Sequence, residues 1–325
     1  VLVMDAPSAR ALGEYNWASV FWHELAHTFH LAASDNRVPR WFSEGLAVHE
    51  QRKAREGWGH QPSIQFLSAL REDRLKPFSE LDDGFMRPDF PGQVVLSYYQ
   101  ASLVFQLIEE EYGFDAIRNM LTGYADGLAT AELLERETGV TVEDFDATFD
   151  DYLRTRFAGP LGGLLPVADA PGPEASIEQL EAFALANPGD LATRLRLGAL
   201  HFRAENWGVS EEHFRAALRI FPEYGGLDSP YYFLARIHRE QGRLAPAQAA
   251  LASLNALSES NYDALLLQAD ILDELGRPAE SAAALDKAVL IWPDEIELHE
   301  RLADRHAELG DIASEVRERA AVVSL

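Results

Sequence analysis

Three glycines in the last third of the chain, Gly242, Gly276 and Gly310, are spaced by 34 residues each. Apolar pairs of the form Leu-Gly or Leu-Ala recur before such turns, at positions 197, 234 and 302. Glycine is favoured where a tight turn between two helices needs a positive φ. The spacing therefore predicts a stack of helix pairs, in which each pair buries its apolar face against the next.

A period of 34 residues with alternating helices and turns resembles the tetratricopeptide repeat. Four repeats are predicted, over 188–222, 228–261, 262–293 and 296–325. The resemblance implies an α-helical solenoid whose concave surface holds a peptide or a partner protein. A second interpretation, a spacer that only supports or dimerises the rest of the chain, fits the same sequence. His201, His238 and His306 fall near equivalent repeat positions and are interpreted as structural.

A different motif, His-Glu-Leu-Ala-His, lies near the start of the chain at residues 23–27. Asn16 is a candidate N-cap for a helix here. On that helix His23 and His27 share one face, and two neutral imidazoles one turn apart can hold one Zn²⁺. Glu24 is offset around the helix, so it can act as a general base without being a ligand.

The third ligand is predicted to be Glu44, on a second helix that starts at Pro39. Two histidines and one carboxylate leave a fourth tetrahedral position open, which is typical of catalytic rather than structural zinc. A metzincin-type site would need glycine at position 30 and histidine at position 33, and the chain has His30 and Ala33. Cysteine, the usual ligand of structural zinc, is absent from the sequence.

The stretches HELAHTFH (23–30) and VPRWFSEGLAVHE (38–50) resemble the gluzincin zinc metallopeptidases, and most closely the bacterial peptidase MA-like proteins. The resemblance implies one Zn²⁺ bound by His23, His27 and Glu44, with Glu24 as the general base. In related aminopeptidases a tyrosine steadies the oxyanion, and aligning the apolar run before Gly113 assigns that role to Tyr98, with Tyr99 as the alternative.

The expected fold class is mainly α with a small β element: a catalytic domain of the thermolysin or aminopeptidase type, followed by the repeat solenoid. The β-branched run Val1–Met4 is the candidate strand beside the active-site helix. The predicted domains are a metallopeptidase domain at 1–158, a Gly- and Pro-rich linker at 159–175 and a repeat domain at 176–325.

The net charge of −25 is shared by both halves of the chain. Such acidity disfavours nucleic acid and anionic membranes as partners. No apolar run is long enough to cross a membrane. The sequence starts without methionine or a signal peptide, so we expect a fragment or a processed form. The family resemblance implies a bacterial protein that acts outside the cytoplasm or at a membrane.

The leading hypothesis is therefore a zinc-dependent peptidase whose repeats bind substrate or a partner protein. The alternative is a non-catalytic repeat scaffold or interaction protein with a vestigial metallopeptidase domain. Zinc-dependent hydrolysis of another substrate is also open, because the ligands activate water without choosing the substrate. The sequence does not separate internal cleavage from removal of N-terminal residues.

Overall fold

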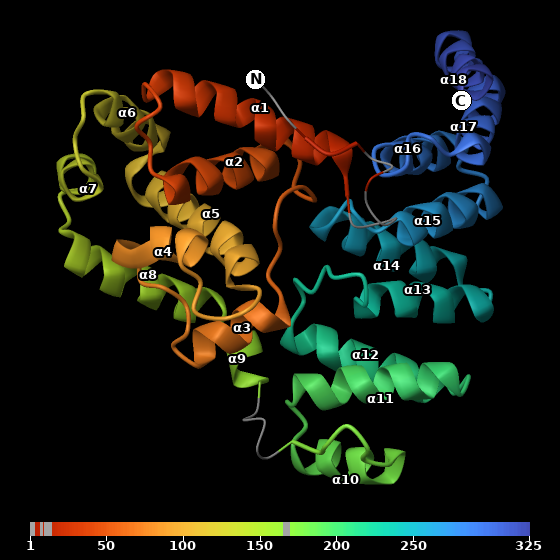
Figure 1. The fold of residues 1–325 in the computed structure, drawn as a ribbon. Coiled ribbons are helices and arrows are strands. Elements are labelled where there is room, and N and C mark those ends of the chain that lie inside the picture. Colours follow the sequence, from red (N-terminus) through yellow and green to blue (C-terminus); the bar gives the residue numbers. More distant parts are fainter. Residues whose placement is uncertain (1–3, 7–8, 10–14, 165–169) are drawn as a thin grey trace. The chain divides into compact units, whose positions relative to one another are not determined.

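The structure is a computed structural model that describes residues 4–6, 9, 15–164 and 170–325 (Figure 1). These residues form two compact units. The first contains residues 1–4 and 21–162, and the second contains residues 5–20 and 163–325. Among the described residues no helix is long and apolar enough to span a bilayer.

The first unit is built from helices of very different lengths. Its elements are α1 (Trp17–Ala33, whose first turn falls in the second unit), α2 (Arg40–Ala54), α3 (Ile64–Arg71), the short 3₁₀ helix η2 (Phe78–Glu80), α4 (Leu81–Met86), α5 (Gln93–Tyr112), α6 (Phe114–Ala125), α7 (Thr130–Thr138), α8 (Val142–Arg156) and α9 (Ala158–Gly162).

The core of this unit is the contact between α2 and α5. Gly45 permits it, because a Cβ at this position would lie only 2.7 Å from the Cβ of Ala101. Next to this contact the rings of Trp41 and Phe42 pack on Phe105, with centroid distances of 5.6 and 4.8 Å. The close packing fixes α2 at the turn that carries Glu44.

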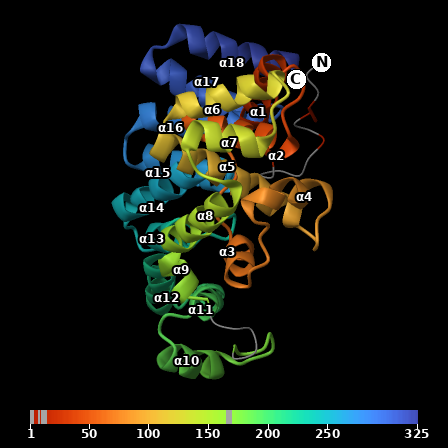
Figure 2. The ribbon, with the colours of Figure 1, turned by 90° about the vertical axis from the view of Figure 1, so that its left-hand side faces the viewer.

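The second unit is a regular series of antiparallel helices, whose order is clear in Figures 1 and 2. Its helices are α10 (Ile177–Ala186), α11 (Leu191–Arg203), α12 (Trp207–Ile220), α13 (Pro230–Glu240), α14 (Leu244–Leu257), α15 (Tyr262–Glu274), α16 (Pro278–Val289), α17 (Ile296–Leu309) and α18 (Ile312–Ser324). The last eight form four consecutive pairs that coincide with the four predicted repeats. The helical repeat prediction is thus confirmed.

Left-handed residues end the first helix of each pair. Gly242, Gly276 and Gly310 have φ values of 68°, 70° and 72°, as their spacing predicts. In the first pair the same place is taken by Glu205, with φ 57°. A backbone hydrogen bond closes this turn as well. The N–H of Asn206, the residue after Glu205, donates to a carbonyl of the preceding helix at 2.9 Å.

Glu205→Gly is therefore expected to raise the free energy of unfolding by up to about 1 kcal/mol, because a left-handed conformation is costly for a residue with a Cβ. Urea unfolding followed by circular dichroism measures the change. Gly242→Ala is the matched control and should destabilise the fold by a similar amount; no atom lies within 4 Å of the added Cβ, so only backbone strain changes. A neutral or destabilising Glu205→Gly substitution would contradict this account.

The start of α1 packs within the second unit. Asn16 caps the helix as predicted, accepting the N–H of Ser19 at 3.1 Å. Its side-chain amide also donates to the Glu259 carbonyl at 3.0 Å. The N–H of Trp17 donates to the Leu290 carbonyl beyond the end of α16, at 3.0 Å.

The expected fold class is wrong. The described residues form eighteen α-helices and contain no strand, so a catalytic domain with a β element is not what this sequence builds. Most of the predicted strand Val1–Met4 lies outside the described residues, and Met4 is not in a strand. Physically, the apolar residues of the first unit are buried by the packing of helix against helix. The aromatic side chain of Phe29 on α1 is an exception and stays 67% exposed.

The predicted domain limits can be placed on this structure. The two units divide between Gly162 and Gly163, inside the predicted linker 159–175. The linker range also contains most of the short helix α9, and its residues 165–169 lie outside the described residues. Residues 5–20, predicted to belong to the first domain, group with the second unit.

Candidate metal centre

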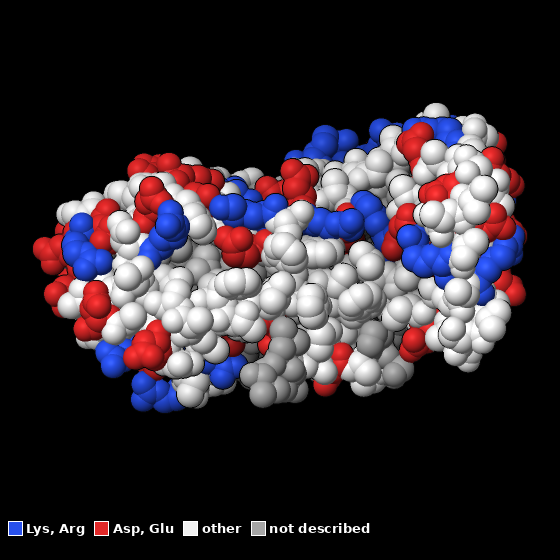
Figure 3. Space-filling view, turned by 90° about the horizontal axis from the view of Figure 1, so that it is seen from above, with Lys and Arg blue, Asp and Glu red and all other residues white. Residues whose placement is uncertain are grey.

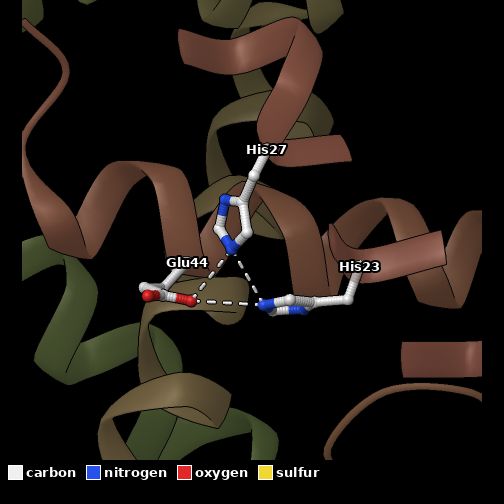
Figure 4. Close-up of side chains that lie close together, drawn as sticks. All are labelled: His23, His27 and Glu44. Carbon is white, nitrogen blue, oxygen red and sulfur yellow. Dashed lines mark hydrogen bonds and ion pairs between the residues drawn. The ribbon is translucent and has the colours of Figure 1, made fainter. Parts of the chain in front are cut away.

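Helices α1 and α2 bring the three predicted ligands together. His23 and His27 project from adjacent turns of α1, and Glu44 comes from α2 (Figure 4). The Nε2 atoms of the two histidines are 3.1 Å apart, and each lies 3.2 Å from Oε2 of Glu44. This is the one group of potential metal-ligating side chains found among the described residues.

The other ring nitrogen of each histidine is hydrogen-bonded outside the triad. Nδ1–H of His23 donates to Oε1 of Gln51 at 3.1 Å, and Nδ1 of His27 lies 2.8 Å from the hydroxyl of Ser43. When Nδ1 carries the proton, Nε2 of a neutral imidazole presents a lone pair. Three lone-pair atoms then converge on one point, and no arrangement of hydrogen bonds among them satisfies all three.

These three atoms fit a zinc ion. Tetrahedral ligands at Zn–N and Zn–O distances of about 2.0–2.1 Å lie about 3.3 Å from one another. The observed separations of 3.1–3.2 Å are close to this value. Hydrogen bonds to the outer nitrogens are also typical of metal-ligating histidines, because they fix the tautomer and the ring orientation.

The electrostatics of Glu44 suit a ligand. Burial by itself would raise the pKa of this carboxyl, but the contacts with His23 and His27 outweigh it and lower the pKa to about 2. The second carboxylate oxygen, Oε1, lies 3.4 Å from Nε of Arg40, one turn earlier on α2. Glu44 is therefore ionised at neutral pH and held from both sides.

The predicted catalytic residues lie around this triad. Glu24 is half-buried on α1, with no hydrogen bond or ion pair to any described residue, so its carboxylate is free to accept a proton. The ring of Tyr98 on α5 lies 6.1 Å from that of His23. Burial and the negative charge of Glu44 raise the pKa of the Tyr98 hydroxyl, against an opposing interaction with Arg40, so this hydroxyl stays protonated.

Tyr99, the alternative donor, points elsewhere. Its side chain is buried, and its ring packs against Phe66 and Phe157 in the core, at centroid distances of 4.8 and 6.4 Å. Of the two tyrosines, the structure therefore places Tyr98 beside the triad.

Several residues of this site were not singled out from the sequence. Arg40 and Gln51 precede and follow Glu44 by four and seven residues, so a polar stripe on α2 was the available signal. His60 comes from the segment after α2 and stacks on Tyr98 with a centroid distance of 5.0 Å. No periodicity in the sequence points to His60, because it lies outside a helix.

The histidines of the repeats occupy a different environment. His201, His238 and His306 are buried, each four residues before the left-handed residue that ends its helix. Nε2 of His201 lies 3.0 Å from a carboxylate oxygen of Glu181. None of the three belongs to a metal-ligating group within the described parts of the chain.

Comparison with known proteins identifies the repeats. Residues 170–224 and 232–296 match the tetratricopeptide repeat family. This part of the chain is thus built from tetratricopeptide repeats, which supports a role in protein–protein interaction. No curated protein matches the chain, and no peptidase family was detected. The repeat match supports the interaction role that was the alternative hypothesis.

Solved structures of MamA are similar to part of the chain. One, described as the crystal structure of MamA, has 18% sequence identity and a TM-score of 0.40, covering 46% of this chain and 85% of its own. Another, described as the crystal structure of MamA protein, has 17% identity and a TM-score of 0.40, covering 54% and 86%.

Proposed function

We propose that the first unit holds a zinc-dependent hydrolytic centre that cleaves peptide bonds, in a protein whose repeats bind other proteins. The observation that carries this proposal is the convergence of three potential metal-ligating atoms from His23, His27 and Glu44. Two imidazoles and one carboxylate are the ligand set that leaves a position open for chemistry.

Each residue of the centre has a separate task. Zinc, when bound, supplies a Lewis acid that activates water and polarises a carbonyl. The free carboxylate of Glu24 accepts a proton from the attacking water and delivers it to the leaving amine. The protonated hydroxyl of Tyr98 donates a hydrogen bond to the oxyanion of the substrate.

The hydrolytic centre is tested by metal content and cleavage together. Purified protein is analysed for zinc per chain and incubated with a mixed peptide library, before and after removal of metal with a chelator and after return of zinc. One zinc per chain with chelator-sensitive, zinc-restored cleavage supports the proposal. Zinc without cleavage supports an interaction scaffold with a non-catalytic metal site, and absence of zinc from the triad refutes the metal centre.

Tyr98→Phe is expected to lower kcat for peptide cleavage by about 10²–10³-fold, the usual cost of losing one oxyanion donor. Zinc content should stay unchanged because the tyrosine is not a ligand. Tyr99→Phe is the matched control, since its ring packs in the core. An equal loss of kcat in both variants would contradict the role of the Tyr98 hydroxyl. It would show that the substitutions act through the folding of α5.

A further inference from the structure

Helix α10 lies at one end of the repeat stack, next to α11 of the first helix pair (Figure 1). Its apolar contact with the stack is small. Leu180 and Ala184 are buried against Leu197 of α11, whereas Leu185, the next residue along α10, is 86% exposed. Polar contacts with α11 therefore contribute to the attachment of α10.

The side chain of Arg194 on α11 connects α10, α11 and α12. Nη2 donates to the carbonyl of Ala184 in the last turn of α10 at 3.0 Å, and Nε donates to the carbonyl of Pro188 beyond that helix at 3.1 Å. Nη1 donates to Nδ1 of His213 on α12 at 3.3 Å. We call these three hydrogen bonds of one guanidinium the Arg194 clasp.

The Arg194 clasp requires a neutral His213. Arginine has only donors, so Nδ1 of His213 is the lone-pair atom of the ring and Nε2 carries the proton. A second proton can enter only at Nδ1, where it would displace Nη1 of Arg194. It would also place two cations in contact at a side chain that is only 8% exposed. Protonated His213 and the intact clasp therefore exclude each other.

The surroundings of His213 oppose its protonation. Burial, Arg194 and His201 lower the pKa of His213 and outweigh the opposite effect of Glu212 and Glu181. On the other side of α12, α13 contributes apolar contacts, in the cluster that contains Phe214, Leu234 and Ile237.

A second polar contact also joins α10 to α11. The ring of His201 is stacked on that of His213 at a centroid distance of 5.8 Å, and Nε2 of His201 lies 3.0 Å from Oε1 of Glu181 on α10. Acid strengthens this pair by charging the imidazole. The Glu181 side chain is 48% exposed, however, and an ion pair exposed to solvent contributes little. The clasp therefore dominates the response of α10 to acid.

From these contacts we propose that α10 is a pH-sensitive cover of the repeat stack, closed at neutral pH and released as acid protonates His213. In the open form His213 is free of Arg194 and has the ordinary histidine pKa of about 6.5. The pKa of the closed form is lower, so closure is favoured above about pH 6.5 and is weakened progressively below it. Release uncovers the apolar face of α11 around Leu197, on which a helix of a partner protein can pack.

Hydrogen exchange of the full chain, followed by mass spectrometry at about pH 7.5 and about pH 5.5, tests this cover. Each rate is divided by the rate of an unstructured chain at the same pH. Protection of α10 should fall by up to about tenfold, the limit that linkage sets one pH unit below the ordinary histidine pKa. Helix α15 contains no histidine and is the internal reference, whose protection should stay unchanged.

On the face drawn in Figure 3, acidic side chains are interspersed with Lys and Arg rather than gathered in one patch. Loosening by general protonation of carboxylates would therefore not be confined to one helix. An equal loss of protection in α10 and α15 would show such loosening and would overturn the proposal. Unchanged protection of α10 at about pH 5.5 would overturn it as well.

Three variants assign the response to the clasp. His213→Gln keeps an acceptor for Arg194 at both pH values, so the loss of protection in α10 should disappear. His238→Gln replaces a buried histidine of the next helix pair and is the matched control, in which the loss should remain. Arg194→Met removes the clasp, so α10 should be less protected already at about pH 7.5. A pH-dependent loss that persists in His213→Gln would contradict the role of this histidine.

Discussion

Glu24→Gln is expected to bind one zinc per chain as the wild type does, and to cleave peptides about 10²–10⁴-fold more slowly. Glutamine keeps the shape of the side chain but cannot take a proton from water. Zinc binding should be unaffected, because the three donor atoms of the triad come from His23, His27 and Glu44. The measurement is kcat/KM on a cleaved library peptide, with zinc content determined on the same preparation.

A matched variant separates the loss of a base from the loss of a negative charge. Glu110→Gln removes a carboxylate from α5 that hydrogen-bonds Gln106 in an exposed position, and should leave the rate unchanged. Retention of full activity in Glu24→Gln would exclude this carboxylate as the base. A loss of zinc in Glu24→Gln would show instead that Glu24 supports the metal centre itself.

His27→Ala is expected to weaken zinc binding by more than about a hundredfold. Loss of a residue that only hydrogen-bonds a ligand already costs 10–100-fold, and this change removes a ligand itself. Competition with a fluorescent zinc chelator measures the affinity, and thermal unfolding without metal shows whether the apo fold survives. This control is needed because His27→Ala also removes the contacts of the imidazole with Ser43 and Glu44.

The control is His30→Gln, one turn further along α1. The ring of His30 lies 6.1 Å from that of His27, yet His30 does not belong to the ligand triad. Zinc affinity should change little in this variant. If His30→Gln and His27→Ala weaken zinc binding equally, the ligand set is wrong.

Much of the second unit could be predicted from the sequence because its signals are local. The glycine turns at 242, 276 and 310 depend on backbone conformation within a few residues, and each helix pair packs mainly on its neighbours in sequence. The pairing of His23 with His27 is also local, since it needs only one helical turn. Glu44 could also be predicted as a ligand, because only a short connection joins α1 to α2.

The environment of the candidate metal centre required the tertiary structure. Gln51 and Ser43 meet the outer nitrogens of the histidines because tertiary packing brings α2 beside α1. The same packing places Tyr98 beside His23 and buries Tyr99. The sequence contains two adjacent tyrosines. The orientation of α5 against distant elements decides which of the two lies beside the triad.

By itself the sequence determined the helix pairs, their turns and the three candidate metal ligands, because these follow from contacts a few residues apart. It did not determine the architecture around α1, where a resemblance in two short motifs led to the expectation of a β element. The described structure is helical, since the burial of apolar faces depends on which distant elements meet. The same long-range packing left a mostly apolar pocket open between α1, α2 and α6.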